Sequence, residues 1–159
     1  MNFTHQIYSL SDKFYNAYPK EQFPEILEKK DRPYNCLLIE TSYDYYICIP
    51  YRSRIVHENA YLFTETERSR RSRSGLDYSK MVIIKDTEYF NDSPALVDND
   101  EYRETIRNIN TIMKDVKEFV NEYLKYKRGI STLSNSVLRK KYYYSSLKYF
   151  HEELGLPTC

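Results

Sequence analysis

The chain has 159 residues, the usual length of one compact domain, and 41% apolar against 30% charged residues allow a core and exclude wholesale disorder. Its 24 Lys and Arg against 23 Asp and Glu give a formal net charge of +1, which excludes a generally polycationic protein but not a locally basic face. The three glycines are too few for a Walker phosphate loop or a GxGxxG turn, which excludes an ordinary P-loop NTPase or Rossmann enzyme.

The cysteines and histidines predict neither disulfides nor a metal centre. Cys36, Cys48 and Cys159 are odd in number and form no CxxC pair, and the three histidines are scattered without zinc-site spacing. Cys36 and Cys48 lie in apolar runs and are expected as buried free thiols, typical of a reducing compartment. Because no signal peptide or membrane-length apolar run is present, we expect a soluble, cytoplasmic protein. We expect no cofactor.

Helix signals come first along the chain, and strand signals follow. Ser11-Asp12 suits the cap of a helix over 13–18 that Pro19 ends, and Pro24 fits the first position of a helix over 25–30. Asn35–Thr41 and Tyr45–Tyr51 are rich in β-branched, aromatic and apolar residues, and the three residues between them predict a tight hairpin.

A third strand is predicted at Lys80–Ile84, which contains a short apolar run. The polar stretch 64–75 lacks periodicity and is expected as a loop. The stretch 86–101 carries six acids, no Lys or Arg, and Pro94, and is expected as a loop too.

The longest predicted element is a helix over Asp100–Lys127, followed by Gly129 as a suitable C-terminal cap. Its apolar stripe repeats at spacings of three and four and comprises Ile106, Ile109, Met113, Val116, Val120 and Tyr123. A last helical region is predicted over Ser136–Leu154, where Gly155 and Pro157 supply stop signals. This order predicts a single α+β domain over residues 1–159 with a small antiparallel or barrel-like sheet.

The segment that leaves the second strand has the composition of a phosphate-directed site. Arg52 and Arg54 flank the hydroxyl of Ser53, and His57 follows within a turn. Guanidinium groups hold phosphate oxygens and histidine transfers protons near neutral pH, as metal-free RNA cleavage requires. The alternative is a surface strand end with ordinary salt bridges and a solvated histidine.

Three further basic segments are candidates for RNA contact. The first is a dense arginine run, Arg68, Arg70, Arg71 and Arg73. Such a run binds phosphates without reading the base sequence, and the alternative is a solvated mobile loop. In the second, residues 29–34, Arg32 is placed to reach a phosphate and Tyr34 to stack on a base, unless Tyr34 is a core edge. In the third, residues 139–144, basic residues precede three tyrosines, of which one or two belong to the core. Carboxylates do not cluster near these segments, which argues against a two-metal nuclease.

Four short motifs, matched in order and spacing over most of the chain, resemble the toxins of type III toxin–antitoxin systems, the ToxN/AbiQ group and most closely its CptN branch. The first motif is Ile7–Leu10 before a Lys/Phe/Tyr helix, and the second is Arg32-Pro33-Tyr34 before a strand ending in Glu40. The third is a strand that closes on Pro50 and is followed by Ser53, a basic residue and His57. The fourth is Leu76–Ile84 before the long helix. Ser53 matches the second hydroxyl residue of the family motif, Arg54 its lysine and His57 its histidine. Arg52 replaces the first hydroxyl residue, and the intervening proline is missing.

The resemblance implies a fold like that of MazF and Kid, a small twisted SH3-like β-barrel with a long amphipathic helix and further helices around it. It also implies a metal-independent endoribonuclease that leaves a 2′,3′-cyclic phosphate and a 5′-hydroxyl. The implied antitoxin is a repeated RNA pseudoknot that the toxin cuts from its precursor. Toxin and RNA then close into a heteromeric ring in which the RNA occupies the active site. Cellular RNAs are the other expected partners, with no membrane and no DNA.

On this basis Arg52, Ser53, Arg54 and His57 are expected to be catalytic. The residues expected to bind RNA are Tyr15, Lys29, Lys30, Arg32, Tyr34, Arg68, Arg70, Arg71, Arg73, Tyr78, Lys80, Arg139, Lys140 and Lys141. A non-catalytic RNA-binding module of a ribonucleoprotein assembly is the main alternative, since it uses the same arginines and tyrosines without needing Ser53 or His57. A protein-interaction domain that docks a partner on its long helix would leave the arginine run without a purpose.

Overall fold

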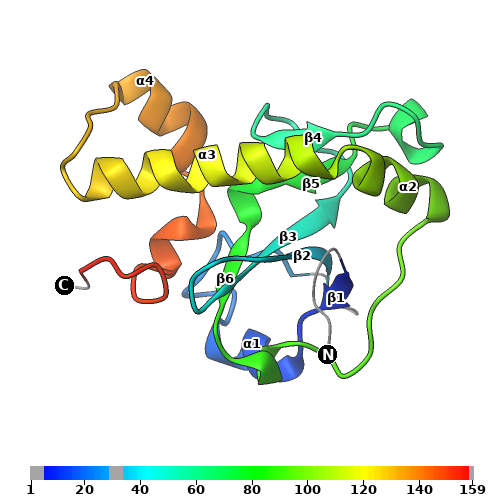
Figure 1. Ribbon diagram of the computed structural model, residues 1–159, viewed down its shortest axis with the longest axis horizontal. Helices are drawn as coiled ribbons and strands as arrows, with labels where there is room; N and C mark the ends of the chain where they lie inside the picture. The colour runs from blue at the N-terminus through cyan, green and yellow to red at the C-terminus, as the bar shows by residue number, and fades with distance from the viewer. Residues whose placement is uncertain (1–5, 29–33, 158–159) are drawn as a thin grey trace.

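The computed structural model describes residues 6–28 and 34–157 and has an α+β architecture, as predicted. Six antiparallel strands form one sheet, with helices on its faces and ends (Figure 1). The strands are β1 (Ile7–Ser9), β2 (Asn35–Glu40), β3 (Tyr46–Arg52), β4 (Ala60–Leu62), β5 (Gly75–Asp77) and β6 (Val82–Ile84). The α-helices are α1 (Asp12–Ala17), α2 (Asn99–Arg107), α3 (Ile109–Lys127) and α4 (Asn135–Val137).

Strand β3 organises the sheet because it pairs with three other strands. Its residues 46–50 pair with β2, residues 46–48 pair with β6 on the other edge, and residues 51–52 continue along β5. The strand order is β1-β2-β3-β5-β4, with β6 paired to β3, and the sheet is open among the described residues. The antiparallel sheet is therefore confirmed, whereas the pairing that would close it into the expected barrel is not seen in this part of the chain.

Strands β2 and β3 form where the sequence predicts them, within one residue at each end. Both are buried on both faces through most of their length, which explains why their sequences are continuous apolar runs and not alternating ones. Cys36 and Cys48 are buried free thiols, as expected, and burial raises the pKa of Cys36 to about 12. These two strands carry the central part of the core.

Helix α1 also forms as predicted, with the Ser11 hydroxyl accepting a hydrogen bond from the Phe14 backbone N–H at its N-cap. The predicted helix over 25–30 is wrong for residues 25–28, which form turns and irregular chain, and the remaining two residues lie outside the described ranges. A Lys20 ammonium that donates to the carbonyls of Pro24 and Ile26 holds this segment in its turn conformation.

The single long helix of the prediction is two helices, because the chain breaks at Asn108. At the break the Glu104 carbonyl accepts both the Asn108 backbone N–H, at 3.1 Å, and the Asn108 side-chain amide, at 2.9 Å. Helix α3 then crosses one side of the sheet (Figure 1) and buries Ile112, Val116, Phe119, Val120, Tyr123 and Leu124. Ile106 is exposed at the end of α2, so the predicted stripe is correct only within α3. Gly129, at φ +73°, follows α3 as its predicted cap.

The predicted helix over Ser136–Leu154 is a succession of short helical turns instead. After α4 come a π-helical turn over Leu138–Tyr142 and a 3-10 turn over Ser146–Tyr149. The Tyr142 hydroxyl donates to the Phe119 carbonyl, and Ser145 caps the next turn, so side-chain anchors interrupt the regular helix. No helix within the described ranges is both long and apolar enough to cross a membrane.

Candidate active site

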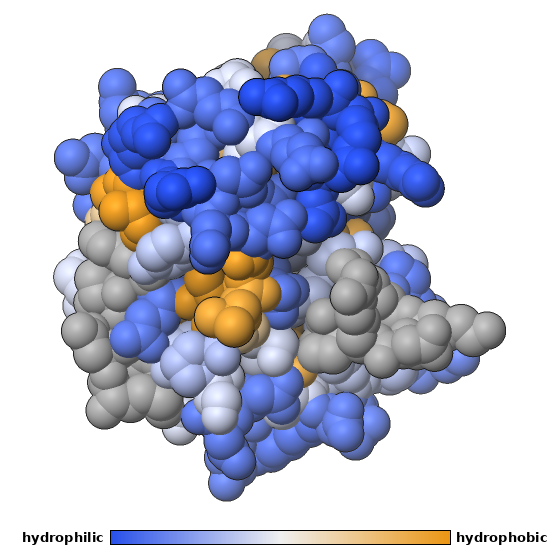
Figure 2. All heavy atoms as spheres, turned by 90° about the vertical axis from the view of Figure 1, so that its right-hand side faces the viewer, coloured by the Kyte–Doolittle hydropathy of each residue, from blue (hydrophilic) through white to orange (hydrophobic). Residues whose placement is uncertain are grey.

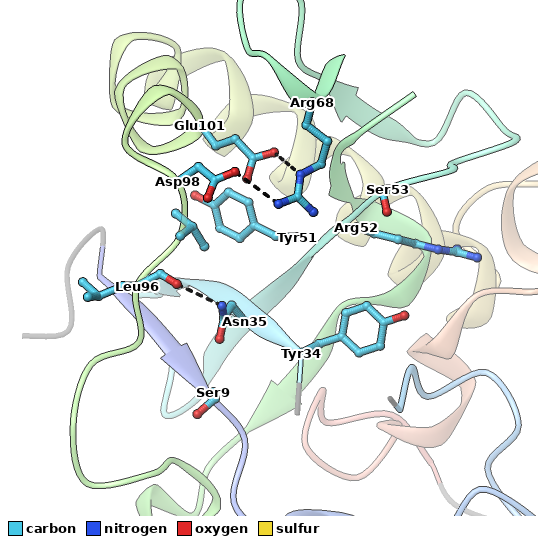
Figure 3. Close-up of a pocket in the computed structure, with 11 residues that line it drawn as sticks. Ser9, Tyr34, Asn35, Tyr51, Arg52, Ser53, Arg68, Leu96, Asp98 and Glu101 are labelled. Carbon is cyan, nitrogen blue, oxygen red and sulfur yellow. Dashed lines mark hydrogen bonds and ion pairs between the residues drawn. The ribbon is translucent and has the colours of Figure 1, made fainter. Parts of the chain in front are cut away.

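A polar hollow of about 340 Å³ lies where β3 ends (Figure 3). Its lining residues are Ser9, Tyr34, Asn35, Tyr51, Arg52, Ser53, Arg68, Leu96, Val97, Asp98 and Glu101. On one side the Arg68 guanidinium points at Asp98 and Glu101, and on the other lie Arg52, Ser53 and Tyr34. The hollow thus brings together two of the four residues expected to be catalytic, Arg52 and Ser53, and Tyr34, the tyrosine expected to stack on a base.

Behind Arg52 lies a fully buried carboxylate, that of Asp77. The antiparallel pairing of β5 with the end of β3 brings Asp77 next to Arg52, whose Nη1 donates to Asp77 Oδ2 at 2.7 Å. The other oxygen, Oδ1, accepts from the Ser79 hydroxyl at 2.6 Å and from the Ser79 backbone N–H at 3.0 Å. Among the described residues Asp77 is the only hydrogen-bond partner of the Arg52 guanidinium, which leaves its other N–H groups for a ligand.

His57 joins the same carboxylate from the loop after β3. Its Nε2 lies 3.2 Å from Asp77 Oδ1 and 3.3 Å from Oδ2, and 3.3 Å from the Ser79 hydroxyl. Its Nδ1 accepts the backbone N–H of Asn59 at 3.0 Å, which places the proton of the neutral ring on Nε2, facing Asp77. Both ring nitrogens are therefore engaged within the protein, and His57 positions Asp77 and, through it, Arg52.

This arrangement is not the triad of a serine hydrolase. Such a triad needs one histidine nitrogen on the carboxylate and the other on the serine, whereas here Asp77 and Ser79 share Nε2. The Ser79 hydroxyl donates to Asp77, and its side chain is buried. Ser79 consequently fixes the carboxylate and does not act as a nucleophile.

Asp77 stays ionised because of these donors. Burial alone would raise the pKa of its carboxyl, but hydrogen bonds from His57, Ser79 and Arg52 outweigh that effect and lower the pKa below its ordinary value. A buried anion next to one guanidinium fixes that cation in place and offsets its charge.

Arg54 has the only positive φ of any non-glycine residue within the described ranges, at 59°. This left-handed conformation costs a non-glycine residue about 1 kcal/mol or more and is held here by its neighbours. Ile55 is completely buried, and its backbone N–H donates to the Arg73 carbonyl. The strained turn directs the chain so that Arg54 itself is exposed beside Ser53.

The arginine run does not act as one patch, because two of its members are engaged within the protein. Arg68 pairs with Asp98 and Glu101, and Arg73 donates to the carbonyls of Ile55 and His57. Arg70 and Arg71 are exposed, and Arg71 has only a 4.0 Å contact to an exposed glutamate. Figure 2, which faces the side that carries α2, shows strongly hydrophilic side chains gathered across its upper part.

We expect Arg73 and Arg70 to differ sharply when replaced by alanine. Arg73→Ala removes two hydrogen bonds that hold the loop of His57 and should lower the free energy of unfolding by about 1–2 kcal/mol. Arg70→Ala should leave stability within about 0.5 kcal/mol of the parent and reduce the log–log salt slope of single-strand RNA binding by about 0.7. Urea denaturation and salt titration measure the two effects, and equal destabilisation by both variants would contradict the assignment.

The other residues expected to bind RNA lie in different surroundings. Tyr78 is buried with its hydroxyl on Asp115, and Lys80 is held by Glu25 at 2.7 Å. Tyr15 packs against the core, Lys141 pairs with Glu122, and Arg139 and Lys140 are exposed. Lys29, Lys30 and Arg32 lie outside the described residues. Lys140 and Lys141 nevertheless line a hollow with His57 and Asn59, whose side-chain amide donates to the Lys140 carbonyl, so these two lysines lie beside the His57 end of the site.

Asp77, Ser79 and Asn59 are the site residues that sequence reasoning missed. Asp77 precedes a predicted strand and follows a polar stretch, where an acid is normally exposed. The sequence does show that Arg52 and His57 each need an acidic partner, and Asp77 is an acid beside a predicted strand. That need was the available signal. Within the described ranges no group of three or more His, Cys, Asp or Glu side chains is arranged to hold a metal ion.

Comparison of the chain with known proteins found no matching family model, no matching curated protein and no matching solved structure.

Proposed function

We propose that this chain is a metal-independent endoribonuclease toxin of a type III toxin–antitoxin system, inhibited by a repeat RNA pseudoknot that it cuts from its precursor. The observation that carries the proposal is the buried Asp77 carboxylate, which holds Arg52 and His57 together beside a polar hollow. The strained backbone of Arg54 at the same place supports it, since such strain gathers at functional sites. The assignment to a type III toxin–antitoxin system and the RNA antitoxin rest on the resemblance of the motifs to that family.

The reaction that these groups support is transesterification at phosphorus. The 2′-oxygen attacks, the P–O2′ bond forms and the P–O5′ bond breaks, leaving a 2′,3′-cyclic phosphate and a 5′-hydroxyl. The 2′-hydroxyl loses its proton to solvent or a base, and the leaving 5′-oxygen gains one. Arg52, with its unengaged N–H groups, and Arg54 stabilise the charge that develops on the phosphorane, and the Ser53 hydroxyl donates to one of its oxygens.

His57 acts as a positioning residue in this scheme, because neither of its ring nitrogens is free for substrate. Tyr34 lines the same hollow and offers a ring on which an unpaired base stacks. The implied SH3-like architecture is part of the same proposal, and what supports it is the antiparallel sheet in which β3 pairs with β2, β6 and β5.

Growth arrest on induction tests this function with matched variants at Arg54. Arg54→Gly removes the side chain and suits the left-handed backbone, so that only the loss of charge is felt, whereas Arg54→Lys keeps the charge. We expect the parent and Arg54→Lys to arrest growth, and Arg54→Gly to lose roughly a hundredfold in cleavage rate and permit growth. Lys114→Ala, which removes an exposed cation on α3, serves as the control and should arrest growth like the parent.

The engagement of both His57 nitrogens also favours a second candidate, a non-catalytic RNA-binding module. A parent that binds RNA in a gel shift but never arrests growth would support that module and contradict the toxin. For the toxin we expect a tandem-repeat RNA gene immediately upstream of the reading frame.

A further inference from the structure

A second hollow, of about 580 Å³, lies between the C-terminal half of α3 and the short helical turns that follow it. It shares no lining residue with the hollow beside Arg52, and its wall is mostly aromatic and cationic. The lining residues that matter here are Tyr126, Lys127, Tyr142, Tyr143, Tyr144 and Lys148. In Figure 1 these elements lie at the end of the molecule opposite β1 and α2.

Three consecutive tyrosines at this hollow divide into an anchor and two exposed rings. Tyr142 is buried, and its hydroxyl oxygen lies 2.8 Å from the Phe119 carbonyl oxygen and 2.9 Å from Glu122 Oε1, which share its one proton. That anchor leaves Tyr143 and Tyr144 64% and 62% exposed, with ring centroids 4.8 Å apart and planes at 77°. Two adjacent exposed aromatic rings in one place are typical of a binding surface.

The charges around these rings are cationic. The Lys127 ammonium lies 5.6 Å from the Tyr126 ring centroid, and the Lys148 ammonium donates to the Tyr143 carbonyl at 3.3 Å. Among the described residues that line the hollow, Glu25 is the single acid, and it is paired with Lys80 and, at 3.7 Å, with Lys148. The hollow therefore combines ring faces with an excess of positive charge.

We propose that this hollow binds single-stranded RNA, with a base stacked on Tyr143 or Tyr144 and the backbone phosphates near Lys127 and Lys148. Stacking on aromatic rings beside cations is how proteins hold single strands without reading their sequence. An apolar protein segment would use the rings but gain nothing from the ammonium groups, so the charge favours a polyanion. The inference needs no catalysis and stands independently of the proposed ribonuclease activity.

The experiment measures binding of a labelled 2′-O-methyl oligouridine twelve-mer by fluorescence anisotropy, because this probe has no 2′-hydroxyl and is not cleaved. The double variant Tyr143→Ala/Tyr144→Ala should bind at least about tenfold more weakly than the parent. The double variant Tyr143→Phe/Tyr144→Phe, which keeps both rings, should bind like the parent. Tyr43→Ala is the control, since Tyr43 is 71% exposed in the hairpin between β2 and β3 and should not affect binding.

An abasic twelve-mer of equal charge separates stacking from electrostatic attraction. The parent and the double alanine variant should bind this probe equally, because it has phosphates but no bases. The proposal is overturned if the double alanine variant binds oligouridine like the parent, if Tyr43→Ala weakens binding as much, or if the phenylalanine pair shares the loss. Since the probe is not a substrate, each of these results is independent of whether the protein cleaves RNA.

Discussion

Replacing Asp77 with alanine is expected to reduce RNA cleavage at least a hundredfold and to lower the free energy of unfolding by about 3 kcal/mol. The side chain is fully buried and accepts hydrogen bonds from Arg52, His57 and Ser79, so its removal leaves those donors without their partner. The stability effect lies at the low end of the range for a buried ion pair, because Arg52 and His57 retain some access to water. In a chain of this length it corresponds to a fall in Tm of roughly 10 °C.

Asp77→Asn distinguishes the positioning of Arg52 from the stability of the fold. An amide has one acceptor oxygen, and if that oxygen stays on Ser79, the NH₂ group faces Arg52 and repels its N–H. We therefore expect a smaller loss of stability than for Asp77→Ala but a similar loss of cleavage. Because the freed guanidinium keeps its charge, the affinity for RNA should be unchanged or higher, which separates a rate effect from a binding effect.

The pH dependence of stability follows from the lowered pKa of Asp77. Its folded value lies below the unfolded value of about 3.9, so the stabilisation is present above that pH and is lost as the pH falls through the folded pKa. The difference in urea midpoint between the parent and Asp77→Asn should accordingly shrink below pH 4. Asp44→Asn, an exposed acid paired with Lys85, is the matched control and should change neither cleavage nor stability noticeably. Full cleavage activity in Asp77→Asn would contradict the proposed role of Asp77 in positioning Arg52.

Gly75→Ala is expected to be far more disruptive than alanine at either of the other two glycines, Gly129 and Gly155. A Cβ at this position would lie 1.9 Å from the Tyr61 carbonyl oxygen and 3.0 Å from the Leu62 Cα, both of which are backbone. Strand β4 would have to move away from β5, and since Gly75 also pairs with Arg52 on β3, the end of β3 at the candidate site would move too. We expect a loss of about 3 kcal/mol or more in the free energy of unfolding, together with loss of activity.

Gly129→Ala is the control for this substitution. Nothing lies within 4 Å of a Cβ at Gly129, so only its left-handed φ of 73° opposes alanine, at about 1 kcal/mol. Thermal denaturation followed by circular dichroism compares the two variants. Equal stability losses at the two glycines would show that β4 can move away from β5 at little cost, which would contradict the close approach of the two strands.

The elements predicted correctly from the sequence are those whose local signals are strong. The apolar runs of β2, β3 and β6 and the Ser11 cap of α1 are local features that tertiary contacts do not override, although β6 begins two residues later than predicted because Lys80 ends a 3-10 turn. Strands β1, β4 and β5 have three residues each, too few for a period to be read, and they exist because longer strands pair with them. The break at Asn108 was missed because apolar spacing continued across it.

The site was half predictable for a similar reason. Arg52 and His57 stand in one short segment with an interpretable composition, whereas their shared partner Asp77 reaches them only through the pairing of β3 with β5. The arginine run shows the converse: all four arginines are exposed, but Arg68 and Arg73 are held by hydrogen bonds and ion pairs, whereas Arg71 has only a 4.0 Å contact to a glutamate. Both the position of Asp77 and the different surroundings of the four arginines depend on partners that are distant in the sequence.

The measurement that tests the central claim most directly is the chemistry of the cut ends. The purified chain is incubated with a single-stranded RNA in EDTA, and the fragments are analysed by mass spectrometry. We predict 2′,3′-cyclic phosphate and 5′-hydroxyl ends, with cutting abolished by a 2′-deoxy substitution on the 5′ side of the scissile phosphate and strongly reduced by Arg52→Ala. Fragments with 5′-phosphate and 3′-hydroxyl ends, or cutting that survives the 2′-deoxy substitution, would contradict the proposed reaction.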